Sequence, residues 1–281
     1  MNRQEILLTA FPFILSALLI FGHYGLLVTQ NPQAHSMPLI PALLIQTLKD
    51  SELVPVAPLA PFPKTIVGYV SDVPTTKQQL AKVLGDVKAN QANTLVLRID
   101  LSLTKDGNLI VIHAAETSEE YILRWAKKTV RDAHEKGIYT YLIFMPKDGT
   151  EIADIGGFAD QLQSLLERWA PAAEEHHVAF LDPGIILGHD SLRKVPPEYQ
   201  QLLVKTIEQK IRAMYTGRIG LGVCCVPPTV SSQGYNQLVL IAQTGDVPKN
   251  IELKTLQDAK RYHVEHVFSL DLATNRLTQL K

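Results

Sequence analysis

Short apolar runs alternate with segments of helical spacing from Lys64 to Leu272, and this alternation constrains the fold more than any other feature. Seven of the runs are predicted to be barrel strands: 65–70, 94–101, 139–145, 178–182, 219–226, 237–242 and 266–272. Strands that alternate with helices form parallel sheets with right-handed crossovers. Strands that are apolar throughout are typical of sheets buried on both faces. The sequence therefore predicts an α/β fold, a (β/α) barrel of the TIM type.

The end of the chain leaves this predicted barrel one unit short. Only nine residues follow Leu272, too few for another helix and strand. A further apolar run, NLIVIHA, follows Asp106-Gly107, and a DG pair between apolar runs is typical of a β-hairpin. We interpret this run as a hairpin that extends the second strand. The barrel is therefore expected to be incomplete, or to be closed at one end by the preceding segment.

The first 36 residues are predicted to be a targeting segment. Residues 6–28 carry no formal charge and consist mainly of Leu, Ile, Phe and Ala. A helix of this length can cross a hydrocarbon core of about 30 Å. Arg3 precedes the run and the next cation is Lys49, which favours a cytoplasmic amino terminus. Two interpretations stay open: a signal anchor, which the length of the run favours, and a signal peptide cut after Ser36. Both place the remaining chain outside the cytoplasm.

Residues 37–63 are predicted to be a tether. Seven prolines lie between Pro32 and Pro63, a density that favours extended, semi-rigid chain. The expected organisation is therefore a membrane segment over 1–36, a tether over 37–63 and the barrel domain over 64–281.

Composition restricts the class of partner. The formal net charge is −1, which gives no electrostatic footprint for nucleic acid. The only two cysteines, Cys224 and Cys225, lie in the apolar segment GLGVCCV and are interpreted as packed thiols rather than a redox pair. No cofactor and no metal site is predicted. The expected partners are the membrane, through residues 6–28, and a glycan or a cell-envelope protein.

Three segments carry a resemblance to a known fold family. They are KKTVRDAHEKGIYTY (127–141), LERWAPAAEEHHVAFLD (166–182) and KIRAMYTGRIGL (210–221). They resemble, in order, the helix and third strand, the helix and fourth strand, and the helix and fifth strand of (β/α)8 glycoside hydrolases. The resemblance covers residues 64–245 and implies a sugar-hydrolase scaffold.

The same resemblance implies that the catalytic chemistry is altered. The family's fourth strand delivers a catalytic carboxylate, usually in an Asn-Glu pair, and Ile185 and Ile186 stand where that pair would be. Sugar hydrolysis usually needs two carboxyls, which this fold places at the carboxyl ends of strands. The carboxyls available there are Asp72, Asp100, Glu116, Asp182, Asp190 and Asp271.

From this set, Asp182, Asp190 and Asp100 are the candidate catalytic residues. Asp182 and Asp190 flank the altered motif. Their alternative, structural roles are to cap the Pro-Gly turn and the following segment. Asp100 could instead pair with Arg98 or bind an amide of the hairpin. The candidate substrate-binding residues are Tyr69, Glu116 and His189.

A second resemblance competes with the first. RIDLSLTKDGNLIVIHA (98–114) is similar to the signature of glycerophosphodiester phosphodiesterases, which are also (β/α)8 barrels. Asp100, the Thr-Lys-Asp-Gly turn and His113 match that signature. Arg98 replaces its metal-binding Glu, and Ala114 replaces the Asp after the histidine. The match implies a phosphodiesterase-like enzyme, and these replacements argue against that activity.

The sequence therefore predicts a membrane-anchored, extracytoplasmic barrel related to glycoside hydrolases. We expect it to be catalytically degenerate and to bind a glycan or a protein. The alternatives are an active glycosidase that uses Asp residues and a phosphodiesterase-like enzyme. An apolar barrel mouth would favour binding, and clustered carboxylates would favour hydrolysis.

Overall fold

The computed structural model describes residues 48–59, 62–104, 106–113, 118–147, 151–224, 230–242 and 248–280. One compact unit begins at Leu48 and runs to the end of the chain. Within the described ranges, no helix is both long and apolar enough to cross a membrane. The predicted span over residues 6–28 lies outside these ranges, so the membrane anchor stays a prediction.

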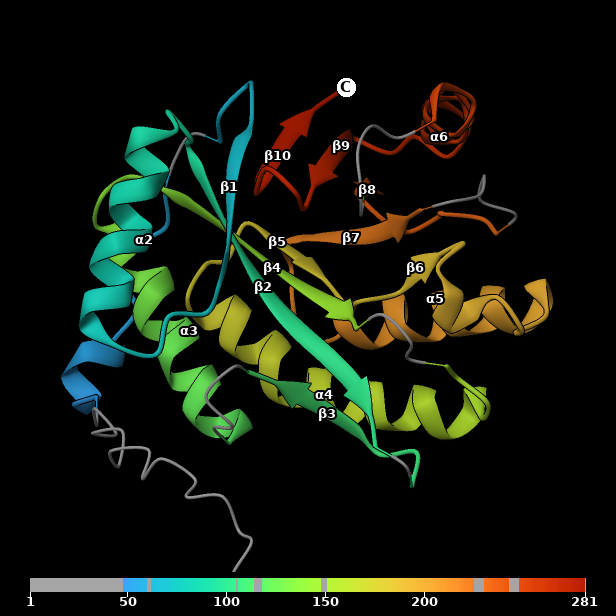
Figure 1. Cartoon of the computed structure of the whole chain (residues 1–281), viewed down its shortest axis with the longest axis horizontal. Helices are drawn as coiled ribbons and strands as arrows, with labels where there is room; N and C mark the ends of the chain where they lie inside the picture. The colour runs from blue at the N-terminus through green and yellow to red at the C-terminus, as the bar shows by residue number, and fades with distance from the viewer. Residues whose placement is uncertain are drawn as a thin grey trace, which may run out of the picture. The chain divides into compact units, whose positions relative to one another are not determined.

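Eight strands form a closed barrel wall (Figure 1). They are β1 (Val67–Asp72), β2 (Thr94–Leu103), β4 (Tyr139–Pro146), β5 (Phe180–Asp182), β7 (Arg218–Val223), β8 (Gln237–Ala242), β9 (His266–Asp271) and β10 (Arg276–Gln279). The strands from β1 to β9 pair in parallel with their wall neighbours, and β10 is antiparallel to both β9 and β1. The predicted TIM-type barrel is confirmed in this coarse sense.

The expectation of an incomplete barrel is wrong, because β10 supplies the eighth wall strand. An antiparallel strand needs no crossover helix, so a short turn after β9 is sufficient. Asp271 Oδ1 accepts hydrogen bonds from the amides of Ala273 (2.9 Å) and Thr274 (3.3 Å), and Asn275 adopts a positive φ of 53°. These contacts fold the turn tightly enough for the last residues to return along the wall.

Five α-helices and two short 3-10 helices are described outside the wall. They are α2 (Lys77–Ala89), α3 (Glu119–His134), α4 (Ile155–Glu175), α5 (Pro197–Arg212) and α6 (Lys249–Arg261), with η1 (Asp50–Leu53) and η2 (Asp190–Leu192). Side-chain oxygens start three of the helices: Thr76 caps α2, Ser118 caps α3 and Asp154 caps α4. Their buried apolar faces form the larger core against the outer side of the sheet.

The predicted hairpin is confirmed. β3 (Leu109–Ile112) pairs antiparallel with β2, with Leu103 opposite Leu109 and Asp100 opposite Ile112. Gly107 in the turn has a φ of +78°, a conformation that favours glycine. The hairpin carries β2 and β3 beyond the wall, as Figure 1 shows.

An aromatic side chain from the segment before β1 packs against the amino-terminal end of the barrel. The ring of Phe62 lies 5.1 Å from those of Tyr139 and Phe180, and the Arg218 guanidinium lies 4.4 Å from its centroid. These three partners are the first residues of β4, β5 and β7. Phe62 therefore packs on this end of the barrel, although it lies within the predicted tether over residues 37–63.

Candidate functional site

The fourth wall strand is broken at the place where the sequence departs from the glycosidase pattern. β5 ends at Asp182, and the chain resumes as β6 (Ile186–Leu187), which pairs with β7. Gly184 lies between them with a φ of +82°, and a Cβ there would be 2.9 Å from the Cβ of Phe144. Only glycine fits this close turn, so the break is built into the sequence.

The two isoleucines after the break are both buried. Ile185 packs in the core beneath the helices, whereas Ile186 packs in the barrel interior. A Cβ at Gly222 would lie 2.8 Å from Ile186 Cγ1, so the glycine makes room for this side chain. Buried apolar neighbours from the carboxyl-terminal ends of other strands share the interior: Val70, Met145, Cys224, Ile241 and Leu270. Ile186 thus belongs to an apolar layer near the barrel mouth.

A polar cluster surrounds Gly220, which faces the barrel interior. A Cβ there would lie 2.6 Å from Gln237 Nε2, 2.9 Å from Tyr141 Oη and 3.1 Å from Asp182 Oδ2. All three polar side chains are fully buried. Asp182 Oδ1 accepts a hydrogen bond of 2.9 Å from the Gly184 amide. In the described part of the chain, Oδ2, the Tyr141 hydroxyl and the Gln237 amide reach no partner with good hydrogen-bond geometry.

Burial controls the charge of Asp182. Removal from water raises the pKa of its carboxyl to about 7, and the Gly184 amide and the nearby Tyr141 hydroxyl oppose this shift only in part. A carboxyl with this pKa is suited to general acid catalysis. Its side chain, however, is 0% exposed, so a substrate has no access to it in this structure.

A second polar cluster lies at the strand ends on the β1–β2 side of the mouth. Arg98 pairs with Asp72 (Nη2 to Oδ1, 2.8 Å) and with Asp100 (Nε to Oδ1, 3.2 Å). Burial raises the pKa of Asp100, and Arg98 opposes that shift. His113 Nε2 lies 2.8 Å from the carbonyl oxygen of Val73. Of the two structural alternatives for Asp100, the pair with Arg98 is therefore observed.

Tyr69 faces the helix layer and not the barrel mouth. Its hydroxyl donates to Asp86 Oδ2 on α2 at 3.3 Å. Together with Asp72, Lys82 and His113 it lines a cleft of about 280 Å³ between β1 and α2. This cleft brings Tyr69 together with two other residues singled out in the sequence, Asp72 and His113.

The remaining candidates lie elsewhere. His189 is buried and caps η2, since its Nδ1 accepts from the Ser191 amide at 3.1 Å. Asp190 is exposed and lies 3.6 Å from Arg193 Nη1. Asp271 is used in the β9–β10 turn, and Glu116 lies outside the described residues.

The three candidate catalytic residues therefore occupy three settings: the sealed interior, the mouth and the surface of η2. No hydrogen bond or ion pair joins any two of them in the described ranges, and their catalytic assignment stays a prediction. Nor do three or more His, Cys, Asp or Glu side chains gather into a potential metal site in those ranges.

Comparison with known proteins supports the fold. The sequence matches no family model and no curated protein. A GH113 β-1,4-mannanase has a similar structure, with a TM-score of 0.50 and 9% identity over 70% of this chain and 67% of the mannanase. The GH113 β-mannanase AaManA from Alicyclobacillus acidocaldarius gives 0.49 and 12% over 69% and 64%. A chitinase from Chromobacterium violaceum gives 0.43 and 9% over 73% and 67%. The first of these likenesses shows a glycoside-hydrolase-like barrel fold, and nothing finer.

Proposed function

We propose that the chain is a membrane-tethered, extracytoplasmic barrel that derives from glycoside hydrolases and acts by binding, without hydrolysis. The ligand in this proposal is a glycan or a cell-envelope protein. The observation that carries it is Ile186, an apolar side chain packed in the barrel interior where the resemblance implies a catalytic carboxylate.

The arrangement of the other carboxyls supports the same conclusion. Retaining glycosidases hold two carboxyls about 5–5.5 Å apart and inverting enzymes about 6.5–9.5 Å, on either side of the scissile bond. Asp182 is sealed beneath apolar side chains, and Asp100 is committed to Arg98. Asp190 is exposed on η2. In the described ranges, no hydrogen bond or ion pair joins any two of these three carboxyls.

The cleft between β1 and α2 is the proposed contact site for a glycan. Its lining includes the side chains of Tyr69 and His113 and the charged residues Asp72 and Lys82. Sugar hydroxyls both donate and accept hydrogen bonds, so a mixed set of polar groups suits them.

The alternative of a glycosidase that uses Asp residues rests on the near-neutral pKa of Asp182. It requires the apolar layer to open and admit a substrate. The phosphodiesterase-like alternative is less favourable, because Arg98 neutralises the carboxylates that would otherwise hold a metal.

The experiment uses the full-length chain, purified in detergent, with oligosaccharides of β-1,4-mannan and chitin. We expect binding detectable by calorimetry and no turnover above the rate of a blank. Tyr69→Ala is expected to weaken binding. Tyr199→Ala is the matched control, because Tyr199 is 50% exposed on α5, outside the cleft.

Robust turnover would contradict the proposal. Loss of that turnover in Asp182→Asn or Asp190→Asn would establish the glycosidase alternative, since removal of a general acid costs about 10²–10⁴ in rate. Turnover that survives both substitutions would make Asp100, Glu116 and His113 the next candidate catalytic residues.

A further inference from the structure

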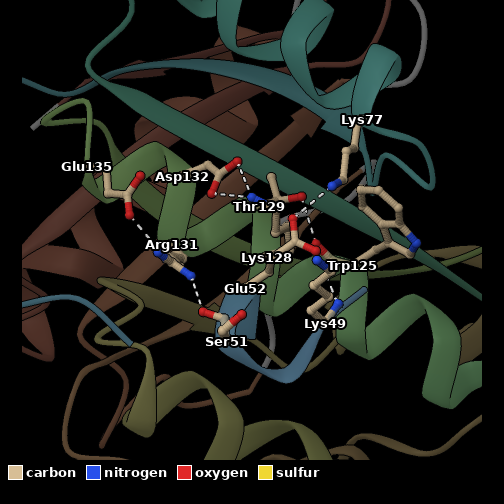
Figure 2. Close-up of polar contacts among 10 residues, drawn as sticks. All are labelled: Lys49, Ser51, Glu52, Lys77, Trp125, Lys128, Thr129, Arg131, Asp132 and Glu135. Carbon is tan, nitrogen blue, oxygen red and sulfur yellow. Dashed lines mark hydrogen bonds and ion pairs between the residues drawn. The ribbon is translucent and has the colours of Figure 1, made fainter. Parts of the chain in front are cut away.

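The described chain begins with a short segment that is fastened across two helices. We call residues 48–54 the strap; it includes η1 and packs on α3. Arg124 Nη2 donates to the carbonyl oxygen of Leu48 at 3.1 Å, and Arg131 Nη1 donates to that of Ser51 at 2.5 Å. Figure 2 shows Arg131 reaching from α3 to Ser51.

The strap is also joined to α2. Lys77 Nζ lies 3.0 Å from Glu52 Oε1, and Glu52 Oε2 accepts from the Lys49 amide at 3.1 Å. The Lys77 ammonium is the main reason why the pKa of Glu52 is lowered. Because the strap contacts both α2 and α3, the point where the chain enters the domain is fixed beside these helices (Figure 2).

A groove of about 480 Å³ runs between α2 and α3, next to the strap. Its apolar lining includes the buried side chains of Leu80 and Leu84 and the exposed small residues Ala81 and Gly85. A Cβ at Gly85 would meet no atom within 4 Å, so this part of the lining is open to solvent.

The other lining residues carry an excess of positive charge. Four are lysines, Lys77, Lys88, Lys128 and Lys136, and one is an acid, Asp132. Asp132 holds Lys128 at 2.6 Å, and Glu52 on the strap holds Lys77. Lys88 and Lys136 are exposed and form no ion pair in the described ranges. The chain as a whole has a net charge of −1, so this concentration of cations is local.

We propose that the groove between α2 and α3 docks on anionic phospholipid headgroups of the membrane that holds the amino-terminal segment. The inference rests on the proposed membrane tether, since it needs a bilayer within reach. An apolar lining edged by lysines is the combination that interfacial membrane-binding surfaces use, with the lysine stems on apolar surface and the ammonium groups at phosphate. Charge complementarity therefore selects an anionic surface.

The strap adds an argument of position. Its first residue, Leu48, lies 20 residues after the end of the predicted span over residues 6–28 in the sequence. The strap is fastened beside the groove, because Glu52 pairs with Lys77, which lines the groove. Docking at the groove would hold the barrel in one orientation on the bilayer.

The test measures lysine exposure in the full-length chain, reconstituted in nanodiscs. One set of discs contains phosphatidylcholine alone, and the other also contains phosphatidylglycerol. Acetylation of each lysine is followed by mass spectrometry. We expect Lys88 and Lys136 to react about fivefold more slowly in the anionic discs, the fold-change equivalent of about 1 kcal/mol for each lysine near the surface. Lys205 on α5 and Lys249 on α6 are exposed controls and should not change.

Because Lys77 lines the same groove, its acetylation should also be slower in the anionic discs. A double variant, Lys88→Gln with Lys136→Gln, should remove this lipid-dependent protection of Lys77 while keeping the thermal unfolding midpoint near that of the parent. Equal acetylation of Lys88 in both discs would overturn the proposal. Protection by dissolved inorganic phosphate in phosphatidylcholine discs would also overturn it, because it would reveal a simple anion site. A chain that fails to co-purify with discs would instead contradict the membrane tether on which the proposal rests.

Discussion

Burial raises the pKa of both Asp182 and Asp100, yet the two carboxyls have opposite electrostatic surroundings. Asp100 lies at the barrel mouth and has Arg98 as a charged partner. Asp182 lies in the sealed interior, where its neighbours Tyr141 and Gln237 are neutral. The mouth therefore stabilises a carboxylate with a cation, whereas the interior favours a protonated carboxyl. Both carboxyls have a raised pKa, so a raised pKa alone does not identify a catalytic acid. A catalytic acid must also be accessible to a substrate, and Asp182 is fully buried.

The largest expected effect is a loss of stability with rising pH that depends on Asp182. The folded-state pKa of about 7 is above the ordinary aspartate pKa of 3.8, so the folded state holds the proton more tightly. The resulting stabilisation is complete below about pH 4 and is lost as the pH rises through about 7. A shift of this size corresponds to about 4 kcal/mol at most.

Urea unfolding of the parent and of Asp182→Asn between pH 5 and pH 8 measures this effect. The difference in unfolding free energy between the two should change with pH in favour of the variant at pH 8. The comparison is needed because His134 and His176, whose pKa values burial lowers to about 4, act in the opposite sense and destabilise the fold as the pH falls. A difference that is constant with pH would mean that Asp182 is ionised in the folded protein.

The next effect concerns the space that the interior cluster needs. In Gly220→Ala the new Cβ would lie within 3.1 Å of Gln237, Tyr141 and Asp182. Overpacking of a buried site typically costs about 1–3 kcal/mol. Thermal unfolding should show this loss. Gly85→Ala on α2 is the matched control, because its Cβ meets nothing within 4 Å and alanine favours a helix by about 1 kcal/mol. Equal behaviour of the two variants would mean that the interior cluster can move aside freely.

The fold and the two clusters differ in how far the sequence predicts them. Seven wall strands can be predicted from the sequence because each is a continuous apolar run. β10 is not, because in Arg276–Gln279 only Leu277 is buried. The mouth pair of Arg98 and Asp100 is local in sequence, so it could be anticipated as an alternative.

The interior cluster depends on register and could not be anticipated in the same way. Gln237 lies beside Gly220 because β7 and β8 pair with these two residues opposite each other. Tyr141 comes from β4, and Asp182 from β5. The one signal in the sequence is a polar residue next to an apolar run, such as Gln237 at the start of QLVLIA, which indicates a polar position in the barrel wall. The cleft was missed for a related reason, since Tyr69 points outward and meets α2.

The smallest expected effect is at the mouth. Arg98→Met removes the cation from Asp72 and Asp100 while keeping much of the side-chain volume. Because the Arg98 side chain is 27% exposed and those of Asp72 and Asp100 are 59% and 36% exposed, solvent screens both pairs. The loss of stability should be about 1 kcal/mol or less.

Without Arg98, which lowers the pKa of Asp100, the pKa of Asp100 should rise further. Urea unfolding at low and at high salt measures the first effect, and an NMR titration of the Asp100 carboxyl measures the second. The difference between parent and variant should shrink in high salt, because salt screens exposed charges, whereas the effect of Asp182→Asn should not. A loss as large as that expected in the interior, unchanged by salt, would show that the mouth cluster is also sealed from solvent and that the two carboxyls are held in the same way.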